Sequence, residues 1–309
     1  MDREQKDMRS FGLIGIYKET FKLIFNLRKI FTQITLTLIL PLSIIFLAHK
    51  QVSDKILSGH HRFEWAAYIT LNLLYFILAL FFSLLSTSAV VYAVACSYAS
   101  REVTFPKIMR AAVPRFWKRL AVTFVCAVLT FAAYNAVLGA TFYLWRAPIA
   151  ALVGLLVLYI VGFVCLSAVW QLAGVVSVLE ERRGFGAAAK GMRLAKGRVF
   201  AVGFVFVVLD AVLVGVNVAG FLVFVTSRGG GHVVIREVGL GAVCVVVLTL
   251  GILFGLVVQT VVYFVCKAEH GETIDRAVLA DQVEVVYLGA APKDVQIMEG
   301  PGQNIRVVV

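Results

Sequence analysis

The sequence predicts an all-α integral membrane protein, and three observations lead to that fold class. Of its 309 residues, 61% are hydrophobic and 15% are charged, whereas an ordinary soluble domain has roughly 45–50% and about 25%. The apolar residues are gathered into six long segments, and about 20 of them in a row suffice to cross a bilayer. The basic residues behind the net charge of +11 lie in short segments beside the apolar ones. We therefore expect the bilayer to be the main solvent of this chain.

The six apolar segments are residues 30–48, 66–97, 120–144, 148–179, 199–226 and 239–266. Each should be a transmembrane helix, because a backbone amide in lipid must find its partner within its own segment. Pro41 interrupts the first segment and predicts a kink. The second, fourth and sixth segments are about 30 residues long, near 45 Å at 1.5 Å per residue, so we expect them to tilt or to extend past the membrane.

The distribution of Lys and Arg predicts the orientation. Of 29 such residues, 23 lie before the first span, in the loops 98–119 and 180–198 and in the C-terminal tail, and six lie in the alternate loops. Positive loops stay in the cytosol. We therefore expect a cytosolic N-terminal segment at 1–29, a membrane domain at 30–267 and a cytosolic tail at 268–309, in either an endomembrane or the plasma membrane.

The two basic loops are also related to each other in sequence. Residues 104–125 align without a gap with residues 184–205, so that Phe105 matches Phe185 and Lys118 matches Arg198. A weaker third copy covers residues 16–29, where chance similarity is the alternative. The pattern predicts three repeated modules, each a cytosolic amphipathic helix followed by a transmembrane hairpin.

Two stretches of sequence resemble known families. Residues 175–198 resemble the cytosolic connection in the membrane domain of bacterial glycerophosphodiester phosphodiesterases. Residues 11–20, 39–49 and 262–270 resemble an uncharacterised group of plant six-span proteins. These resemblances imply a six-helix membrane domain and carry no catalytic residue set, and the soluble phosphodiesterase domain has no counterpart in this sequence.

Asp210 is the single ionisable side chain in the interior of a predicted span. It follows Arg198 by twelve residues, about 18 Å into the membrane at helical rise. An unpaired carboxylate there is costly, so Asp210 must face protein, take up a proton or meet water. It is either a proton or cation site, or a hydrogen-bonding group that joins helices. Candidate neighbours at similar depth are Gln171, Asn135, Gln259 and Thr130.

The cytosolic basic segments are the second candidate site. Their rings and charges suit the interface and anionic headgroups, although positive-inside anchoring alone is the alternative. The candidate headgroup contacts are Arg110, Arg115, Trp117, Lys118, Arg119, Lys190, Arg193, Lys196 and Arg198.

Smaller features of the sequence concern cysteine, histidine and glycine residues. Cys96 and Cys266, at the cytosolic ends of their spans, are candidates for S-acylation, although any thiol near the membrane surface fits that loose pattern and a small hydrophobic residue is the simpler interpretation. His60 and His61 lack the spacing of a tetrahedral metal site, so no metal is expected. Gly251 and Gly255 form a GxxxG pair that should pack within the bundle rather than dimerise the protein.

The sequence favours a non-enzymatic membrane protein that interacts with lipids or organises a protein partner at the cytosolic face. A small transporter or channel built around Asp210 is the alternative. An intramembrane enzyme ranks last, because no nucleophile with a base or paired carboxylates lies at membrane depth. No cofactor is expected, and nucleic acid is not expected as a partner because the basic residues flank the apolar spans.

Overall fold

Every element in the described part of the chain is a helix, which confirms the all-α prediction. The computed structural model describes residues 12–57, 63–99, 104–144, 149–180, 182–226 and 233–270. Each of the six predicted apolar segments is helical. The elements in order are α2 Leu13–Asn26, α3 Arg28–Ile34, the π-helix η1 Thr35–Ile39, α4 Leu40–Leu57, α5 Phe63–Tyr98, α6 Phe105–Lys107, the π-helix η2 Ile108–Ala112, α7 Val113–Leu144, α8 Ile149–Leu179, α9 Phe185–Ala195, α10 Val199–Thr226 and α11 Val233–Glu269.

Within the described residues, five helical stretches are long and apolar enough to cross a membrane. Leu73, Leu158 and Val214 are each more than half exposed, and contiguous exposed apolar surface of this kind marks contact with lipid. These features indicate a protein embedded in a membrane. The five stretches are Arg28–His49, Tyr68–Tyr98, Trp117–Thr141, Val153–Leu179 and Gly241–Glu269, while Ala201–Val216 of α10 is a shorter apolar helix.

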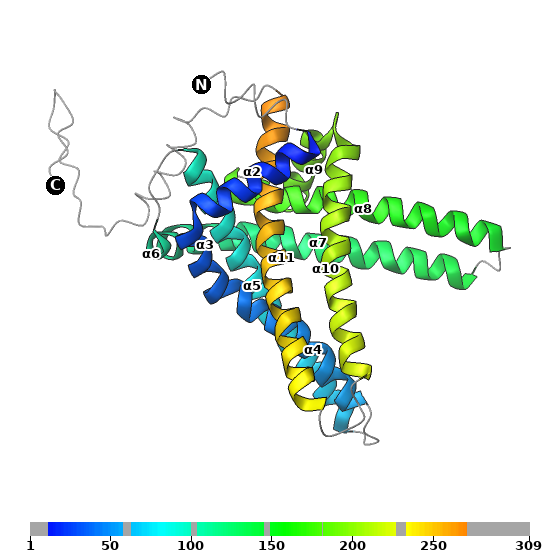
Figure 1. Cartoon of the computed structure of the whole chain (residues 1–309). Helices are drawn as coiled ribbons and strands as arrows, with labels where there is room; N and C mark the ends of the chain where they lie inside the picture. The colour runs from blue at the N-terminus through cyan, green and yellow to red at the C-terminus, as the bar shows by residue number, and fades with distance from the viewer. Residues whose placement is uncertain are drawn as a thin grey trace, which may run out of the picture.

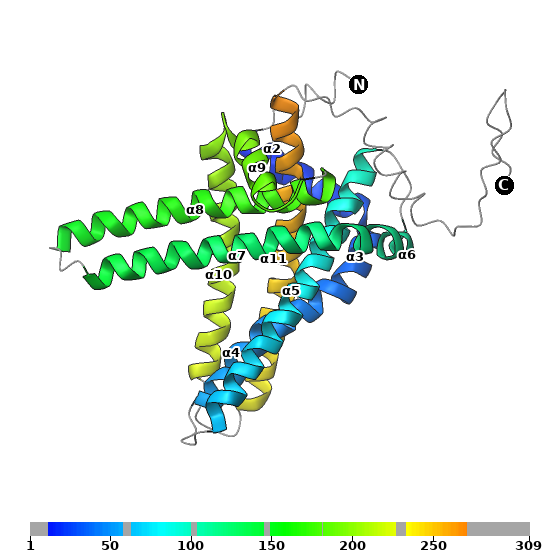
Figure 2. The ribbon, with the colours of Figure 1, turned by 180° about the vertical axis from the view of Figure 1, so that it is seen from behind.

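The long helices pack in pairs, as three hairpins. Helix α4 packs on α5, α7 on α8, and α10 on α11. A shorter helical segment precedes each hairpin: α2, α6 with η2, and α9. The hairpins share one end but not one direction, since in both views α7 and α8 extend away from the line followed by α10 and α11 (Figures 1 and 2).

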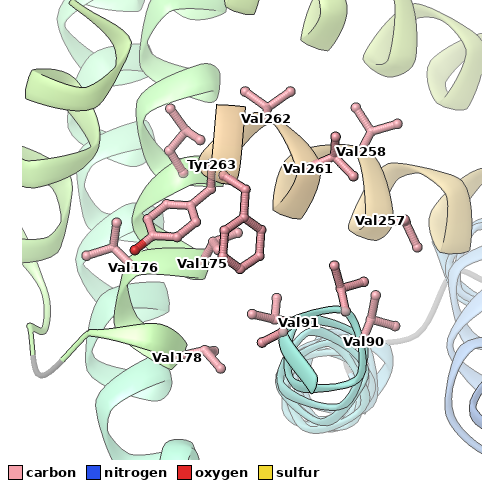
Figure 3. Close-up of a cluster of buried hydrophobic side chains, with 14 of the residues drawn as sticks. Val90, Val91, Val175, Val176, Val178, Val257, Val258, Val261, Val262 and Tyr263 are labelled. Atoms are coloured by element: carbon pink, nitrogen blue, oxygen red, sulfur yellow. The ribbon is translucent and has the colours of Figure 1, made fainter. Parts of the chain in front are cut away.

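The core lies where the C-terminal parts of α5, α8 and α11 meet. Residues 88–96 and 257–266 are buried without interruption, and so is nearly all of 172–178. A helix with one exposed face would alternate every three or four residues, so neighbours must enclose these helix ends on all sides. Figure 3 shows valines of all three helices gathered around Tyr263. The best-packed region is thus at the ends that the sequence places in the cytosol.

Two prolines are each preceded by a π-helical segment. Pro41 follows η1 and Pro114 follows η2 within two residues. A proline ring clashes with the carbonyl four residues earlier, and those carbonyls belong to Thr37 and Arg110, inside the π segments. The wider π turn relieves the clash without ending the helix. The interruption predicted at Pro41 therefore takes the form of a π segment.

The GxxxG pair packs inside the bundle, as predicted. An added Cβ on Gly251 would lie 3.0 Å from Leu213 Cδ2, and one on Gly255 would lie 2.9 Å from Leu209 Cδ2. Both leucines belong to α10. The two glycines therefore allow α10 to approach α11 closely.

Several predicted features lie outside the described residues. They are residues 1–11 of the N-terminal segment, His60 and His61, and the tail beyond residue 270.

Candidate functional site

Asp210 hydrogen bonds across the interface between α10 and α8. Ser167 Oγ donates to Asp210 Oδ2 at 3.0 Å, and Gln171 Nε2 lies 3.3 Å from Asp210 Oδ1. Gln171 Nε2 also donates to Ser167 Oγ at 3.1 Å. Each carboxylate oxygen thus has a donor, and the three side chains form one closed polar cluster between two helices.

A cavity of about 280 Å³ adjoins this cluster. Ser167 and Gln171 line it, and so does Gln259 of α11, whereas Asp210 lies behind its two donors and outside the lining. The walls come from α5, α7, α8 and α11. The lining residues are Ser83, Leu84, Thr87, Leu120, Thr123, Phe124, Ala127, Phe131, Ser167, Trp170, Gln171, Gly174, Leu256 and Gln259.

The structure brings together only some of the predicted neighbours of Asp210. Gln171 contacts it directly, and Gln259 faces the same cavity. Asn135 instead accepts a hydrogen bond from the Tyr159 hydroxyl at 2.9 Å, within the α7–α8 hairpin. Thr130 donates to the Cys126 carbonyl at 2.7 Å and is absent from the cavity lining. Asn135 and Thr130 were predicted as neighbours because they lie at a depth in the membrane similar to that of Asp210. The rotation of α7 about its axis instead turns both side chains toward other partners.

Ser167 was not predicted as part of this site. One indication was its spacing: Ser167 precedes Gln171 by four residues, and residues four apart lie on the same face of a helix. A serine in a span usually bonds to its own helix backbone, so the sequence alone gave no reason to separate Ser167 from the other serines.

The basic residues around α6 and α7 differ in their accessibility. Arg110, Lys118 and Trp117 are exposed, and Arg119 is partly buried. The Trp117 ring packs edge-on against Phe81 of α5, with centroids 5.4 Å apart. The side chain of Arg115 lies outside the described residues.

Helix α9 presents an apolar and basic outer face. Phe185 is 65% exposed and Met192 is 59% exposed, and Arg193 and Lys196 are exposed beside them. Lys190 is partly buried. The opposite face is buried and consists of Ala187, Ala188, Gly191, Leu194 and Ala195.

Close backbone contacts hold α9 in place. An added Cβ on Gly191 would lie 3.1 Å from the Val169 carbonyl oxygen of α8. Gly184, just before α9, has a φ of +57°, which favours glycine, and its N–H donates to Thr123 Oγ1 at 2.8 Å. Thr123 Oγ1 also lies 2.7 Å from Ser177 Oγ. The outer face of α9 is therefore fixed relative to α7 and α8.

The predicted headgroup contact Arg198 has a protein partner. Its Nε lies 2.7 Å from Glu269 Oε2 at the end of α11. By contrast, neither Arg193 nor Lys196 has an acidic partner within the described part of the chain. The two groups of charges therefore have different roles: Arg198 joins helices, and the α9 charges face outward.

Helix α2 crosses α11 (Figure 1). The Tyr17 ring stacks on Phe254 with centroids 5.9 Å apart, and its hydroxyl lies 3.4 Å from the Val205 carbonyl. Burial raises the pKa of Tyr17 above its ordinary value. Lys18 and Phe25 are exposed on the other side of α2. Like α9, this helix combines a packed face with an apolar and basic outer face.

The structure buries both candidate acylation sites. Cys96 and Cys266 are each 1% exposed, because they lie in the enclosed ends of α5 and α11. S-acylation of either thiol would require these helix ends to separate. Among the described residues, no group of three or more His, Cys, Asp or Glu side chains is arranged to hold a metal ion.

The comparisons with known proteins give one match. No curated protein matches the chain, and no solved structure matches it. The match is to a family of unknown function. This agrees with the expectation of an uncharacterised family and shows no link to phosphodiesterases or to plants. The matched family is described as "Domain of unknown function (DUF8558)" and covers residues 1–299, so this chain belongs to that family.

Proposed function

We propose that this protein is a non-enzymatic, multi-pass membrane protein whose cytosolic surface helices bind anionic lipid headgroups. The observation that carries the proposal is the outer face of α9. There two large apolar side chains, Phe185 and Met192, are exposed beside Arg193 and Lys196, which lack acidic partners among the described residues. Helix α2 offers a similar face.

Simple charge bias does not account for this arrangement. Positive-inside topology requires only that Lys and Arg lie in the cytosolic loops, and it places no demand on their neighbours. A rigid helix that presents rings and charges together matches the boundary between headgroups and acyl chains. Each basic residue there contributes about 1 kcal/mol with anionic lipid. A protein partner at the cytosolic face would use the same exposed groups.

The proposed topology has six spans with both termini in the cytosol. Helix α8 has 31 residues, about 46 Å at helical rise, so it would cross a core of about 30 Å when tilted by roughly 50°. If the α7–α8 hairpin tilts one way from the packed end and the other two hairpins tilt the opposite way, the two groups diverge as in Figures 1 and 2, where α4 and α5 run beside α11. Excess helix length and divergence therefore support one geometry, in which the packed end is in the cytosol and the α7–α8 hairpin tilts away from the other two hairpins.

Three repeated modules are part of the same proposal. Each hairpin follows a shorter helical segment, and the matched residues Phe105 and Phe185 are the first residues of α6 and α9. The resemblance to uncharacterised plant six-span proteins and to the phosphodiesterase membrane domain supports a shared membrane scaffold. It carries no activity to this chain.

Lipid retention in native mass spectrometry tests the headgroup proposal. The full chain would be purified in mild detergent with equal amounts of phosphatidylserine and phosphatidylcholine. Arg193→Gln with Lys196→Gln should lower the preference for phosphatidylserine by roughly tenfold or more, because about 2 kcal/mol is removed. The matched control is Lys50→Gln with Lys55→Gln in α4, which removes the same charge at the opposite end of a hairpin. Equal losses in the two double variants, or no anionic preference in the parent protein, would contradict the proposal.

A second candidate function is proton or cation transport through Asp210. It is favoured by one observation: both side chains that donate to Asp210 also line the cavity. In liposomes, Asp210→Asn should then abolish proton or cation flux, and Thr130→Val should leave it unchanged. Flux that is absent from the parent protein, together with a lower melting temperature of Asp210→Asn, would instead favour a purely structural carboxylate.

A further inference from the structure

Three polar side chains that line the cavity have no hydrogen-bond partner. Ser83 and Thr87 lie one turn apart on α5, and Gln259 faces them from α11. None of the three makes a hydrogen bond within the described part of the chain. Gln259 is only 7% exposed, and its side chain borders the cavity.

This pattern contrasts with the neighbouring helix hydroxyls. Ser86, Thr123 and Thr260 each bond to the carbonyl four residues earlier in their own helix, which is the ordinary arrangement in an apolar setting. A polar side chain in an apolar setting is costly unless a protein group, water or a bound molecule meets it, so polar side chains that bond to no protein group call for an explanation such as a bound molecule. Two helices contribute these groups to one cavity, so the cavity has the character of a site rather than of a packing defect.

The rest of the cavity lining is uncharged. Thr123, Ser167 and Gln171 already bond to protein groups. The remaining walls are apolar and include Leu84, Phe124, Phe131 and Trp170, and among the described residues no Lys, Arg, Asp or Glu lines the cavity. Asp210 lies one layer behind, with its oxygens already occupied by Ser167 and Gln171. An anion would meet no positive group and would face this carboxylate, and a cation would be kept from direct contact with it. The groups on offer suit an uncharged molecule with several hydroxyls.

Size and position restrict the molecule further. A volume of about 280 Å³ lies at the lower end of the range of ligand pockets, enough for a small head and a few methylenes. Thr87 and Gln259 lie about 15 Å along the helix from the ends of α5 and α11, whereas Phe131 lies deeper along α7. A head near Thr87 and Gln259 with a chain that extends toward Phe131 has the orientation of a lipid in the leaflet nearest the packed helix ends.

We infer that this cavity binds the uncharged polyol head of a single-chain amphiphile of the monoacylglycerol type. The Gln259 carboxamide and the hydroxyls of Thr87 and Ser83 bond to the head, and the aromatic walls hold the first part of the chain. This site is separate from the basic outer faces and needs only a membrane-embedded chain, so it can fail or succeed independently of the anionic-lipid proposal.

Photolabelling of the full chain in nanodiscs tests the inference. The probe is a monoacylglycerol with a diazirine near the head, and the readout is the labelled peptide identified by mass spectrometry. Labelling should be saturable and should map to α5, α7 or α11. Unlabelled monoacylglycerol should compete, whereas the matching fatty acid and acylcholine should not. Thr87→Val with Gln259→Leu removes two hydrogen-bonding groups at nearly constant volume and should reduce labelling by about tenfold.

The control is Thr130→Val, which removes a hydroxyl from α7 outside the cavity lining and should leave labelling unchanged. Melting temperatures of both variants, measured in the same nanodiscs, verify that they are folded. Labelling that cannot be saturated, or that survives in the double variant, overturns the inference, because the probe then reacts without binding through Thr87 and Gln259. Competition by acylcholine overturns it in favour of a cationic ligand drawn to Asp210, and competition by the fatty acid overturns it in favour of an anion.

Discussion

Arg198 Nε lies 2.7 Å from Glu269 Oε2, and this ion pair joins the start of α10 to the end of α11. The two side chains are 27% and 33% exposed, so solvent screens their attraction. We expect Arg198→Gln and Glu269→Gln each to lower the free energy of unfolding by about 0.5–1 kcal/mol. The free energy of unfolding should fall by less in the double variant than the sum of the two single decreases, because each single substitution already removes the whole ion pair. Thermal unfolding in detergent measures all three, and fully additive losses would contradict a direct coupling.

Two glycines of α9 provide a matched pair of substitutions. Gly186→Ala adds a Cβ in open space and should stabilise the helix by about 0.5–1 kcal/mol. Gly191→Ala gains the same helix propensity but places its Cβ 3.1 Å from the Val169 carbonyl oxygen, where neither backbone can move easily. Overpacking costs about 1–3 kcal/mol, so Gly191→Ala should lower the melting temperature while Gly186→Ala raises it. A rise in both would mean that α9 is not held against α8.

The contact between α10 and α11 at Gly255 allows a rescue experiment. Gly255→Val should destabilise the protein by about 1–3 kcal/mol, because its side chain would occupy the space of Leu209. Leu209→Ala should recover part of that loss in the Gly255→Val background, while it is destabilising on its own. If Leu209→Ala gives no recovery, the two helices do not meet at this point.

A hydroxyl and a carboxylate join the ends of α11 and α8. Tyr263 donates to Glu180 Oε1 at 2.8 Å, and Lys267 Nζ lies 3.8 Å from the same oxygen. Tyr263→Phe removes this hydrogen bond and the longer one that Lys267 Nζ donates to the hydroxyl at 3.4 Å, and it should cost about 1.5–3 kcal/mol. Glu180→Gln keeps an acceptor for the hydroxyl and should cost less. The reverse order of the two losses in thermal unfolding would show that the Lys267 pair, rather than the hydroxyl, holds these ends together.

The thiols differ in burial, and this difference predicts a labelling pattern. Cys165 is exposed on α8, whereas Cys96 and Cys266 are enclosed at the helix ends. A membrane-permeant maleimide should modify Cys165 in the folded protein and should reach the other two only after denaturation. Mass spectrometry of peptides from folded and denatured samples measures this pattern. Modification of Cys96 or Cys266 in the folded protein would show that the ends of α5 or α11 open.

The helices could be predicted from the sequence because the local composition nearly decides them. Long apolar segments such as residues 239–266 have no stable alternative to a helix in lipid. The packing of Gly251 and Gly255 within the chain was also predicted and is confirmed. The directions of the hairpins could not be predicted, because apolar faces such as those of α7 and α8 look alike on every side.

The candidate site was predicted only in part, for a similar reason. Depth along a helix can be counted from the sequence, and it placed Asp210 near Gln171 and Gln259. The rotation of a helix about its own axis cannot be derived from residue numbers in this way. In the structure it turns Asn135 away from Asp210 and places Ser167 beside it.

The sequence by itself determined that this protein is helical and embedded in a membrane, and which of its residues are basic, because hydrophobicity and charge are properties of each segment alone. Only the tertiary structure decided that Asp210 bonds to α8, that Arg198 is paired, and that Ser83, Thr87 and Gln259 face one cavity without partners among the residues that the structure describes. These are contacts between segments far apart in the chain, and they depend on the rotation, spacing and crossing of helices that no single segment encodes.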